Sequence, residues 1–451
     1  MQSPLQSIQE NLGTWHDQLL SCDFILEIAR ETGFVKRFRK LDPAYLVYIL
    51  IFGNSSHIRP TFEEIYWRYV DFDDNPKFSY SISIQSFKKR FDQNMVNFLS
   101  KLLNHYIDMM ISECPARLKS YAARFKDILI QDSSIIRLSQ KLAGEFPAAR
   151  TRNNGAGLKI HAVYSACAHS VKTIEITGER IHDSRMLRIG PAVKNILLLN
   201  DLGYYSLKSF ARIKEYGGYF VSRLKTNAKT NVISVVSGKV PRRIKQPMQD
   251  KNYPELWDFL EKVPKRGIYD LECSFEIQNG QKRSNKPPVE EFFRVICFWN
   301  EKTGLWHTYL TNLSAEHFTP DEVYQLYKYR WLIELLFKEL KADYDLGKLL
   351  IGSSALAYIH IFAMLIRMIV SRNLYSWILL TVEPDKREKY GPLLWSKVFA
   401  EKCHEFLSIL NQWIFGKGEV YERWDKLEKS LRQLAKSRHK KPRLSQAYTT
   451  Q

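Results

Sequence analysis

Hydrophobic and polar positions follow two different periods along the chain, and the change of period divides it. In residues 24–52 and 87–110 apolar side chains recur every three or four positions, which predicts amphipathic helices. From residue 126 onward short apolar runs predict buried strands, at 128–130, 158–165, 171–177 and 195–199. A helical pattern at 205–216 follows the last of these runs, so the pattern predicts an α/β sheet domain.

The remainder of the pattern suggests how the chain is divided. Alternating segments such as 292–299, with turn signals at 279–280 and 286–288, predict a β-rich insertion, and helical periodicity returns at Pro320. We therefore expect a helical region, the first part of the α/β domain, the insertion, the second part of the domain, and a basic helical C-terminal region, at residues 1–125, 126–226, 227–313, 314–380 and 381–451.

Two capping signals in the first helical region predict the starts of helices. Thr61 and Glu64 have the spacing of a capping box, and Ser83 is placed to cap a short helix. That second helix carries Gln85, Lys88, Lys89 and Arg90. A helix, a turn and a polar basic helix are typical of a DNA-reading helix-turn-helix, although a short basic helix is also an ordinary solvated face.

Residues 357–380 are apolar over a length that could cross a bilayer. His360, Arg367, Arg372 and Asn373 interrupt the run, and arginines at the centre of a bilayer cost several kcal/mol. We interpret the segment as a buried core helix, with no membrane partner.

The excess of positive charge predicts a polyanionic partner. The 67 Lys and Arg residues exceed the 48 Asp and Glu residues, for a formal net charge of +19, and nucleic acid is the commonest such partner. The first residues lack a secretory signal, so we expect a cytoplasmic protein, associated with the nucleoid when it is bound to DNA. No cysteine pair has metal or disulfide spacing; the six are Cys22, Cys114, Cys167, Cys273, Cys297 and Cys403.

Two aspartates follow predicted buried strands. Asp132 and Asp201 each come directly after an apolar run, and open α/β sheets place their active sites at the carboxyl ends of such strands. Aspartate is also a common turn or capping residue, so neither position is decisive alone. Asp127 begins the first run and is expected at the opposite end of that strand.

Residues 327–341, YKYRWLIELLFKELK, read as one amphipathic helix. At about 100° per residue the helix has an ionic side and an apolar side. The ionic side is formed by Tyr327, Arg330, Glu334 and Lys341, and the apolar side by Leu332, Ile333, Leu336 and Leu340. An ordinary ion pair between Arg330 and Glu334, worth a few tenths of a kcal/mol, explains the ionic side equally well by itself.

The helix and the two aspartates together favour a chemical role. The carboxylates of Asp132, Asp201 and Glu334 can hold two Mg²⁺ ions about 4 Å apart, an arrangement that serves phosphodiester chemistry. Arg330 and Lys341 would then grip the phosphates that flank the scissile bond.

The spacing Y-x2-R-x3-E-x6-K resembles the signature of the DDE transposases of the IS-four group of insertion sequences. The segments at 158–165, 177–184, 198–206 and 219–227 are similar to that group's blocks around its first two catalytic aspartates, and the resemblance covers residues 128–363. It implies an RNase H-like α/β catalytic domain interrupted by a β-rich insertion, with Asp132, Asp201 and Glu334 as catalytic metal ligands. Mg²⁺, with Mn²⁺ as a substitute, is the implied cofactor.

The resemblance also implies partners and a role for two tryptophans. Trp306 and Trp331 are similar in placement to aromatics that accommodate a flipped nucleotide during hairpin formation, although a Trp in a strand is ordinarily a core residue. The implied partners are double-stranded DNA with terminal inverted repeats, target DNA, and a second copy of the chain in the DNA complex. A regulator descended from a transposase and a stand-alone nuclease of the same fold remain alternatives.

Overall fold

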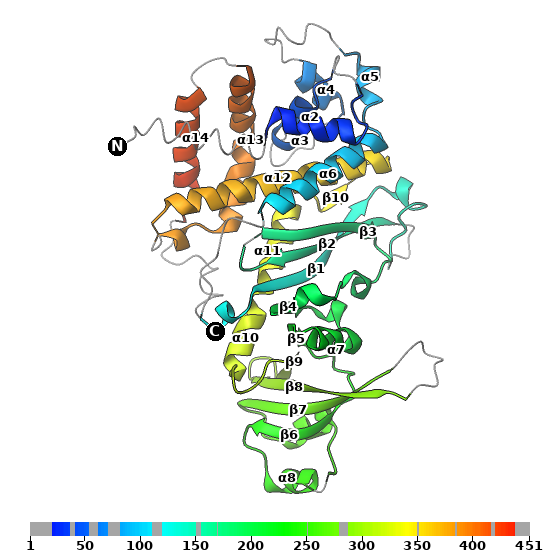
Figure 1. The fold of residues 1–451 in the computed structure, drawn as a ribbon, viewed down its shortest axis with the longest axis vertical. Helices are drawn as coiled ribbons and strands as arrows, with labels where there is room; N and C mark the ends of the chain where they lie inside the picture. Colours follow the sequence, from blue (N-terminus) through cyan, green and yellow to red (C-terminus); the bar gives the residue numbers. More distant parts are fainter. Residues whose placement is uncertain are drawn as a thin grey trace.

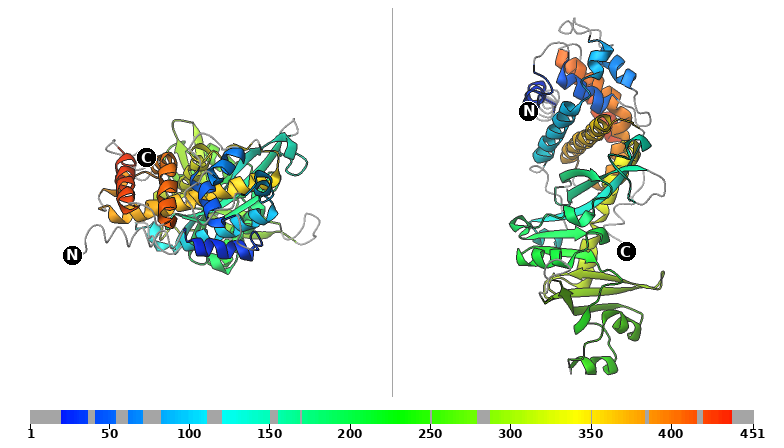
Figure 2. Two further views of the ribbon diagram at one scale, coloured as in Figure 1. Left: turned by 90° about the horizontal axis from the view of Figure 1, so that it is seen from above. Right: turned by 90° about the vertical axis from the view of Figure 1, so that its right-hand side faces the viewer.

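The computed structural model is elongated, with helices at one end, a sheet in the middle and a β-rich opposite end (Figure 1; Figure 2). It describes residues 20–36, 41–53, 62–70, 82–110, 120–149, 155–168, 170–249, 251–278, 287–349, 351–383, 386–415 and 420–437. Thr61 of the predicted capping box, Cys114, the predicted turn at 279–280 and residue 286 lie outside these ranges.

The N-terminal helices are α2 (Cys22–Glu31), α3 (Pro43–Phe52), α4 (Phe62–Val70), α5 (Ile84–Lys88) and α6 (Gln93–Met110). The Ser83 hydroxyl accepts a hydrogen bond from the backbone N–H of Ser86, so the predicted cap of α5 is confirmed. Helix α5 ends at Lys88 and is shorter than the predicted basic helix, and Phe87 anchors it in the core. The helix-turn-helix stays a prediction.

A single sheet runs through the middle and the β-rich end of the molecule. Its strands are β1 (Asp127–Leu138), β2 (Ala156–Ser165), β3 (Ser170–Gly178), β4 (Ile196–Asn200), β5 (Tyr219–Arg223), β6 (Asn231–Ser237), β7 (Ile268–Ile277), β8 (Val289–Asn300) and β9 (Leu305–Thr311). Their spatial order is β3-β2-β1-β4-β5-β9-β8-β7-β6, and β10 (Lys348–Leu349) pairs with β1. The four runs predicted as strands in residues 126–226 all form strands, so the predicted α/β class is confirmed.

Strand direction changes across the sheet. Strand β2 is antiparallel to its neighbours β1 and β3, whereas β4 lies parallel to β1 and β5 parallel to β4. Strand β9 returns antiparallel to β5, and β8, β7 and β6 continue antiparallel. The carboxyl ends of β4 and β5 therefore lie at one edge of the sheet, beside the middle of β1 and the first half of β9.

Each face of the sheet has its own core, because successive side chains of a strand point to opposite faces. Leu197, Leu199 and Val221 belong to the larger core, which also takes in the helices at the upper end of Figure 1. Leu198 and Phe220 belong to the second core, on the opposite face. That second core includes residues of α7 (Leu207–Glu215), α8 (Arg242–Gln249) and α9 (Leu256–Lys262).

The segment predicted as one helix over residues 327–341 is two helices, so that prediction was wrong in its continuity. Helix α10 (Pro320–Lys328) ends and α11 (Trp331–Ala342) begins across Tyr329 and Arg330. The backbone N–H groups of Tyr329 and Arg330 donate to the carbonyls of Leu326 and Tyr327, three residues back. This tighter turn shifts the two halves of the predicted ionic face. The four predicted apolar residues are buried as expected.

The C-terminal helices are α12 (Ser354–Thr381), α13 (Pro392–Phe415) and α14 (Val420–Leu434). In the described residues α12 alone is long and apolar enough to cross a membrane, yet 72% of its most apolar window is buried inside the protein. The predicted core helix is thereby supported. Its two arginines are buried as well: Arg372 pairs with Glu339 of α11, and Arg367 lies over the ring of Tyr344.

Short 3-10 turns complete the described structure, at Ala122–Arg124, Gln140–Leu142, Asp183–Met186 (η4), Pro191–Val193, Leu202–Tyr204 (η6) and Arg387–Lys389. The five described cysteines are free thiols.

Candidate active site

Strand pairing brings the first two predicted ligands side by side. Strands β1 and β4 are parallel, and their last pair is Gln131 with Asn200. The residue that follows Gln131 is Asp132, and the residue that follows Asn200 is Asp201, so both predicted aspartates come directly after this pair. Because neighbouring strands are about 4.8 Å apart, the two backbones hold these side chains next to each other.

The surroundings of Asp132 differ from the sequence-based expectation. Asp201 does follow the end of its strand and begins the turn η6. Asp132 instead lies in the middle of β1, which continues to Leu138, so its placement at a strand end was wrong. The physical reason is that β2 pairs with β1 over its whole second half, whereas β4 stops at Asn200. The site opens where β1 continues past the end of β4. Asp127 lies at the opposite end of β1, as expected.

Helix α11 brings the third carboxylate to this opening. Glu334 lies in the first turn of α11 and forms an ion pair with Arg330. The pKa of Asp132 is raised to about 6, chiefly by burial; the negative charges of Asp201 and Glu334 also raise it, while the Ser133 N–H and Arg330 lower it. The three predicted carboxylates and Arg330 therefore act on one another within a single electrostatic environment.

A row of aromatic and cationic side chains borders the carboxylates. The Arg330 guanidinium lies 5.7 Å from the ring centre of Tyr327, and the Tyr327 ring lies 5.0 Å from that of Tyr309. On the far side of Tyr309, the Arg223 guanidinium lies 5.7 Å from its ring centre. The structure thus links two predicted site residues, Tyr327 and Arg330, to a second arginine.

Sequence reasoning missed Arg223 as a site residue. It ends β5, and the pairing of Asn200 with Ser222 places it beside Asp201 at the same edge of the sheet. The buried Nε atoms of Arg223 and Arg330 have no hydrogen-bond partner in the described part of the chain. The signal was available, since Arg223 lies in a segment already recognised as similar to the IS-four blocks.

The remaining predicted residues are Lys341, Trp331 and Trp306, and their surroundings differ from one another. Lys341 is exposed in the last turn of α11, seven residues or about 10 Å along the helix from Glu334. Trp331 directly follows Arg330 and is 48% exposed. Trp306 lies on the face of the second core, 5.6 Å from the ring of Tyr269 and 5.1 Å from that of Trp299.

The described residues contain no preformed group of three His, Cys, Asp or Glu side chains that could hold a metal ion. Glu334 is engaged in its ion pair with Arg330. The donor set nevertheless fits Mg²⁺ or Mn²⁺, which prefer carboxylate oxygens. The pKa of Asp132 is raised chiefly by burial and also by the nearby charges of Asp201 and Glu334, and a divalent cation would favour its charged form.

The pKa of Asp132 leads to a stability prediction. The folded protein holds the proton of the Asp132 carboxyl group more tightly than the unfolded chain does. Ionisation of Asp132 therefore lowers the stability of the fold progressively between pH 3.8 and about 6, and the loss is complete above that range. The substitution Asp132→Asn removes this penalty. In thermal melts with a chelator we expect the variant to unfold about 2 °C or more above wild type at pH 8, with a smaller gap at pH 5. A lower melting temperature than wild type at pH 8 would contradict the assignment.

Comparison with known proteins identifies the class. The family described as "Transposase DDE domain" matches residues 123–369, more than half of the chain. The transposase for insertion sequence element IS231F of Bacillus thuringiensis subsp. israelensis is 23% identical over 415 residues, 85% of this chain and 84% of the relative. The transposase for IS1151 of Clostridium perfringens is 20% identical over 347 residues, 72% of each.

A solved structure, the piggyBac transposase synaptic complex with hairpin DNA, aligns with 95% of this chain and 86% of its own at 11% identity and a TM-score of 0.43. The family match and the relatives define a transposase of an insertion sequence. The chain belongs to the Transposase DDE domain family, in its IS-four group.

Proposed function

We propose that this transposase cleaves the ends of its insertion sequence and joins them to target DNA at a site formed by Asp132, Asp201 and Glu334. The observation that carries the proposal is the shared environment of the three carboxylates, in which the charges of Asp201 and Glu334 act on the buried Asp132. Two Mg²⁺ or Mn²⁺ ions, when bound, activate the attacking oxygen and stabilise the leaving oxygen of the phosphodiester.

The chain's own residues have separate parts in this proposal. The backbones of β1 and β4 fix Asp132 and Asp201 as a pair of oxygen donors on one edge of the sheet. Glu334 completes the donor set by leaving its ion pair with Arg330. That movement frees the Arg330 guanidinium, which can then bind a phosphate oxygen through charged hydrogen bonds.

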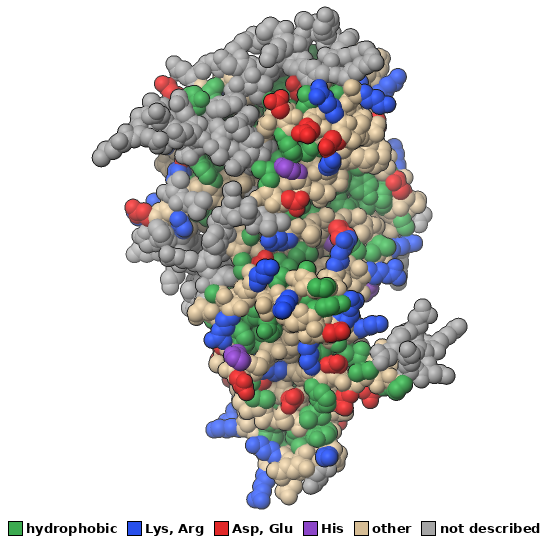
Figure 3. All heavy atoms as spheres, viewed as in Figure 1, with side chains coloured by type: hydrophobic (Ala, Val, Ile, Leu, Met, Phe, Trp, Pro, Cys, Tyr) green, Lys and Arg blue, Asp and Glu red, His purple; other side chains and the backbone are tan. Residues whose placement is uncertain are grey.

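The two buried arginine Nε groups support a phosphate ligand beside the carboxylates. A buried N–H group without an acceptor costs free energy, and an incoming phosphate supplies acceptors for both Arg223 and Arg330. Tyr309 and Tyr327 lie between the two guanidinium groups and hold them apart. We infer that successive phosphates of one DNA strand follow this row. Lys and Arg side chains are also spread widely over the face drawn in Figure 3.

Lys341 provides a test of DNA contact that leaves the carboxylates untouched. If it contacts one phosphate of the cleaved end, Lys341→Ala should lower the slope of log K against log salt by about 0.9. Titrations of an end fragment by fluorescence anisotropy at several salt concentrations measure this slope. Lys429→Ala, on α14, removes the same charge elsewhere and is expected to leave it unchanged. An unchanged slope for Lys341→Ala would assign that residue to an ordinary solvated face.

The two tryptophans are expected to separate on mutation. Trp331 is largely exposed, so Trp331→Ala should leave stability nearly unchanged. Trp306 packs against Tyr269 and Trp299, so Trp306→Ala should lower the free energy of unfolding, by up to about 3 kcal/mol. If either indole stacks on a flipped base, its removal costs about 1–3 kcal/mol in hairpin formation alone.

Assays of nicking and hairpin formation, together with urea unfolding, decide between these roles. Slower hairpin formation with unchanged nicking supports stacking for the residue concerned. If nicking and hairpin formation slow equally and the free energy of unfolding falls as well, the tryptophan has a packing role.

We further propose that residues 126–226 and 314–380 form an RNase H-like catalytic domain and that residues 227–313 are an insertion into it. The order β3-β2-β1-β4-β5, with β4 and β5 parallel to β1, supports the first assignment. The helices of residues 1–125 would recognise the terminal inverted repeats, and two copies of the chain would hold the two ends. A cytoplasmic location follows from this role.

The experiment that tests the proposed function uses DNA carrying the inverted repeats that flank the coding sequence. Purified protein is incubated with this DNA in Mg²⁺, in Mn²⁺ and in a chelator. Cleavage at the repeat ends with either metal and none with the chelator is the expected result. Binding of the repeats without cleavage under all conditions would instead indicate a regulator of transposition, and cleavage without preference for the repeats would indicate a stand-alone nuclease.

A further inference from the structure

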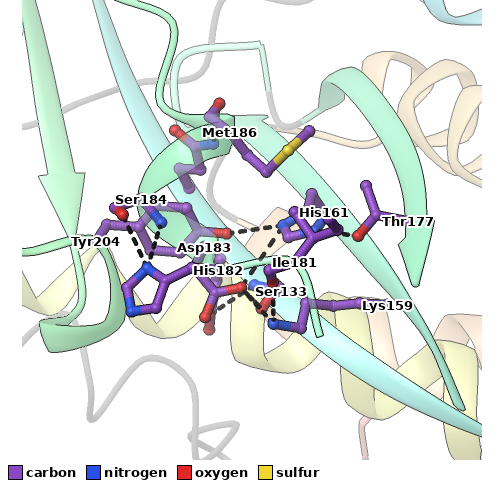
Figure 4. Close-up of polar contacts among 12 residues, drawn as sticks. Ser133, Lys159, His161, Thr177, Ile181, His182, Asp183, Ser184, Met186 and Tyr204 are labelled. Carbon is purple, nitrogen blue, oxygen red and sulfur yellow. Dashed lines mark hydrogen bonds and ion pairs between the residues drawn. The ribbon is translucent and has the colours of Figure 1, made fainter. Parts of the chain in front are cut away.

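A second carboxylate, Asp183, lies behind the candidate active site and has no part in the proposed chemistry. It begins η4 in the connection between β3 and β4, and its side chain is 24% exposed. Figure 4 shows it pointing toward side chains of β1 and β2. Ser133 pairs with His161 across these strands, so both lie on the face opposite Asp132.

One oxygen of Asp183 receives two hydrogen bonds. Its Oδ1 atom accepts from the Ser133 hydroxyl at 2.9 Å and from the Lys159 ammonium at 2.9 Å. The Lys159 side chain is only 10% exposed, and it also donates to the carbonyl of Ile181 at 2.9 Å. Asp183 is therefore tied to the strand position immediately after Asp132.

The other oxygen of Asp183 lies against the turn that carries Asp201. A Cβ atom added to Gly203 would approach Asp183 Oδ2 to 3.2 Å, tighter than ordinary van der Waals contact. Gly203 lies in η6, which Asp201 begins, and the Tyr204 N–H donates to the Asp201 carbonyl at 3.0 Å. The contact extends to β2, because the buried Tyr204 hydroxyl lies 3.3 Å from His161 Nδ1.

We propose that Asp183 is a positioning residue that sets the relative placement of Asp132 and Asp201, by holding Ser133 on one side and Gly203 on the other. This inference rests on the proposed function, since it concerns the metal ligands of that site. Asp183 contacts the face of the sheet opposite Asp132, so it would not itself bind the metals. Residues that orient metal ligands typically change metal affinity or activity by about 10–100-fold when they are replaced.

The first experiment compares Asp183→Ala with Asp183→Asn. Cleavage of an end fragment is followed against Mg²⁺ concentration, and Mn²⁺ binding to the DNA-bound protein is titrated by electron paramagnetic resonance. We expect Asp183→Ala to raise the half-saturating concentration of both metals by about 10-fold or more. Asp183→Asn keeps an oxygen for Ser133 and Lys159 and the shape beside Gly203, so it should recover most of the loss.

A control variant separates positioning from general stability. Glu179 lies in the connection between β3 and β4, as Asp183 does. It is buried and forms an ion pair with Arg137 near the C-terminal end of β1. Glu179→Ala is expected to lower the melting temperature as much as Asp183→Ala does, with no change in the metal requirement. An equal rise in metal requirement for both variants would overturn the proposal.

Gly203 offers a test that does not depend on the stability of Asp183→Ala. Gly203→Ala should raise the metal requirement in the wild-type background, because the new methyl group presses on the Asp183 carboxylate. The same change should have little further effect in Asp183→Ala, so the two effects are not additive. If Asp183→Ala fails to fold at the assay temperature, Gly203→Ala and Asp183→Asn decide the matter, and wild-type metal dependence in Gly203→Ala overturns the proposal.

The outcome also distinguishes this inference from the proposed function. A wild-type protein that neither binds Mn²⁺ nor cleaves its ends contradicts the proposed function itself. A wild-type protein that does both, together with Asp183 and Gly203 variants whose metal requirement is unchanged, contradicts the positioning role alone.

Discussion

Alanine in place of Asp132, Asp201 or Glu334 is expected to slow end cleavage by about a thousandfold or more. Metal ions contribute several kcal/mol to the transition state, and about 1.4 kcal/mol corresponds to a factor of ten in rate. Binding of the ends should persist or tighten slightly, since each change removes negative charge from beside the phosphates. A gel shift and a cleavage assay on the same preparations measure both effects.

The matched control for these three variants is Asp321→Asn, an exposed carboxylate in the first turn of α10. It should cleave at the wild-type rate. Full activity in any of the three alanine variants would remove that residue from the catalytic set, and loss of end binding would point to misfolding instead.

Breaking the ion pair between Glu339 and Arg372 is expected to have the largest effect on stability. Their side chains are 0% and 9% exposed, and the pair joins α11, which carries Glu334, to α12. Either Glu339→Ala or Arg372→Ala leaves a buried charge without its partner, which costs about 3–5 kcal/mol. Urea unfolding of each variant measures the loss.

Two further variants show whether charge burial is the cause. Replacing both partners, Glu339→Leu with Arg372→Met, removes both buried charges and should restore much of the lost stability. Asp425→Ala breaks an exposed pair with Lys429 on α14 and should cost less than about 1 kcal/mol. A loss of that size in Glu339→Ala would mean that the buried pair contributes no more than a surface one.

The sequence predicts much of the site because the active residues follow local rules. Asp201 comes directly after a strand of apolar residues, and Arg330 and Glu334 have helical i, i+4 spacing, so period and position locate them. Other features of the site depend on contacts between residues that are distant in the sequence. The continuation of β1 past Asp132 depends on its pairing with β2, and no local pattern signals that β4 stops first.

The same reason explains the features that the sequence did not predict. The break between α10 and α11 involves no Gly or Pro, so no local signal marks it; it is seen in the hydrogen bonds that Tyr329 and Arg330 donate three residues back. The partner of Arg372 lies 33 positions away on another helix. No local pattern marks Asp183, because the role proposed for it depends on Ser133, 50 positions away, and on Gly203.

The central claim is that Asp132, Asp201 and Glu334 together hold the metal ions that cut the DNA. The most direct test is a crystal structure of the protein bound to a cleaved element end in Mn²⁺, with the metal located by its anomalous scattering. The predicted result is two Mn²⁺ ions about 4 Å apart among the three carboxylates, with Glu334 turned away from Arg330. Mn²⁺ bound elsewhere, with the ion pair of Glu334 and Arg330 intact under conditions that support cleavage, would contradict it.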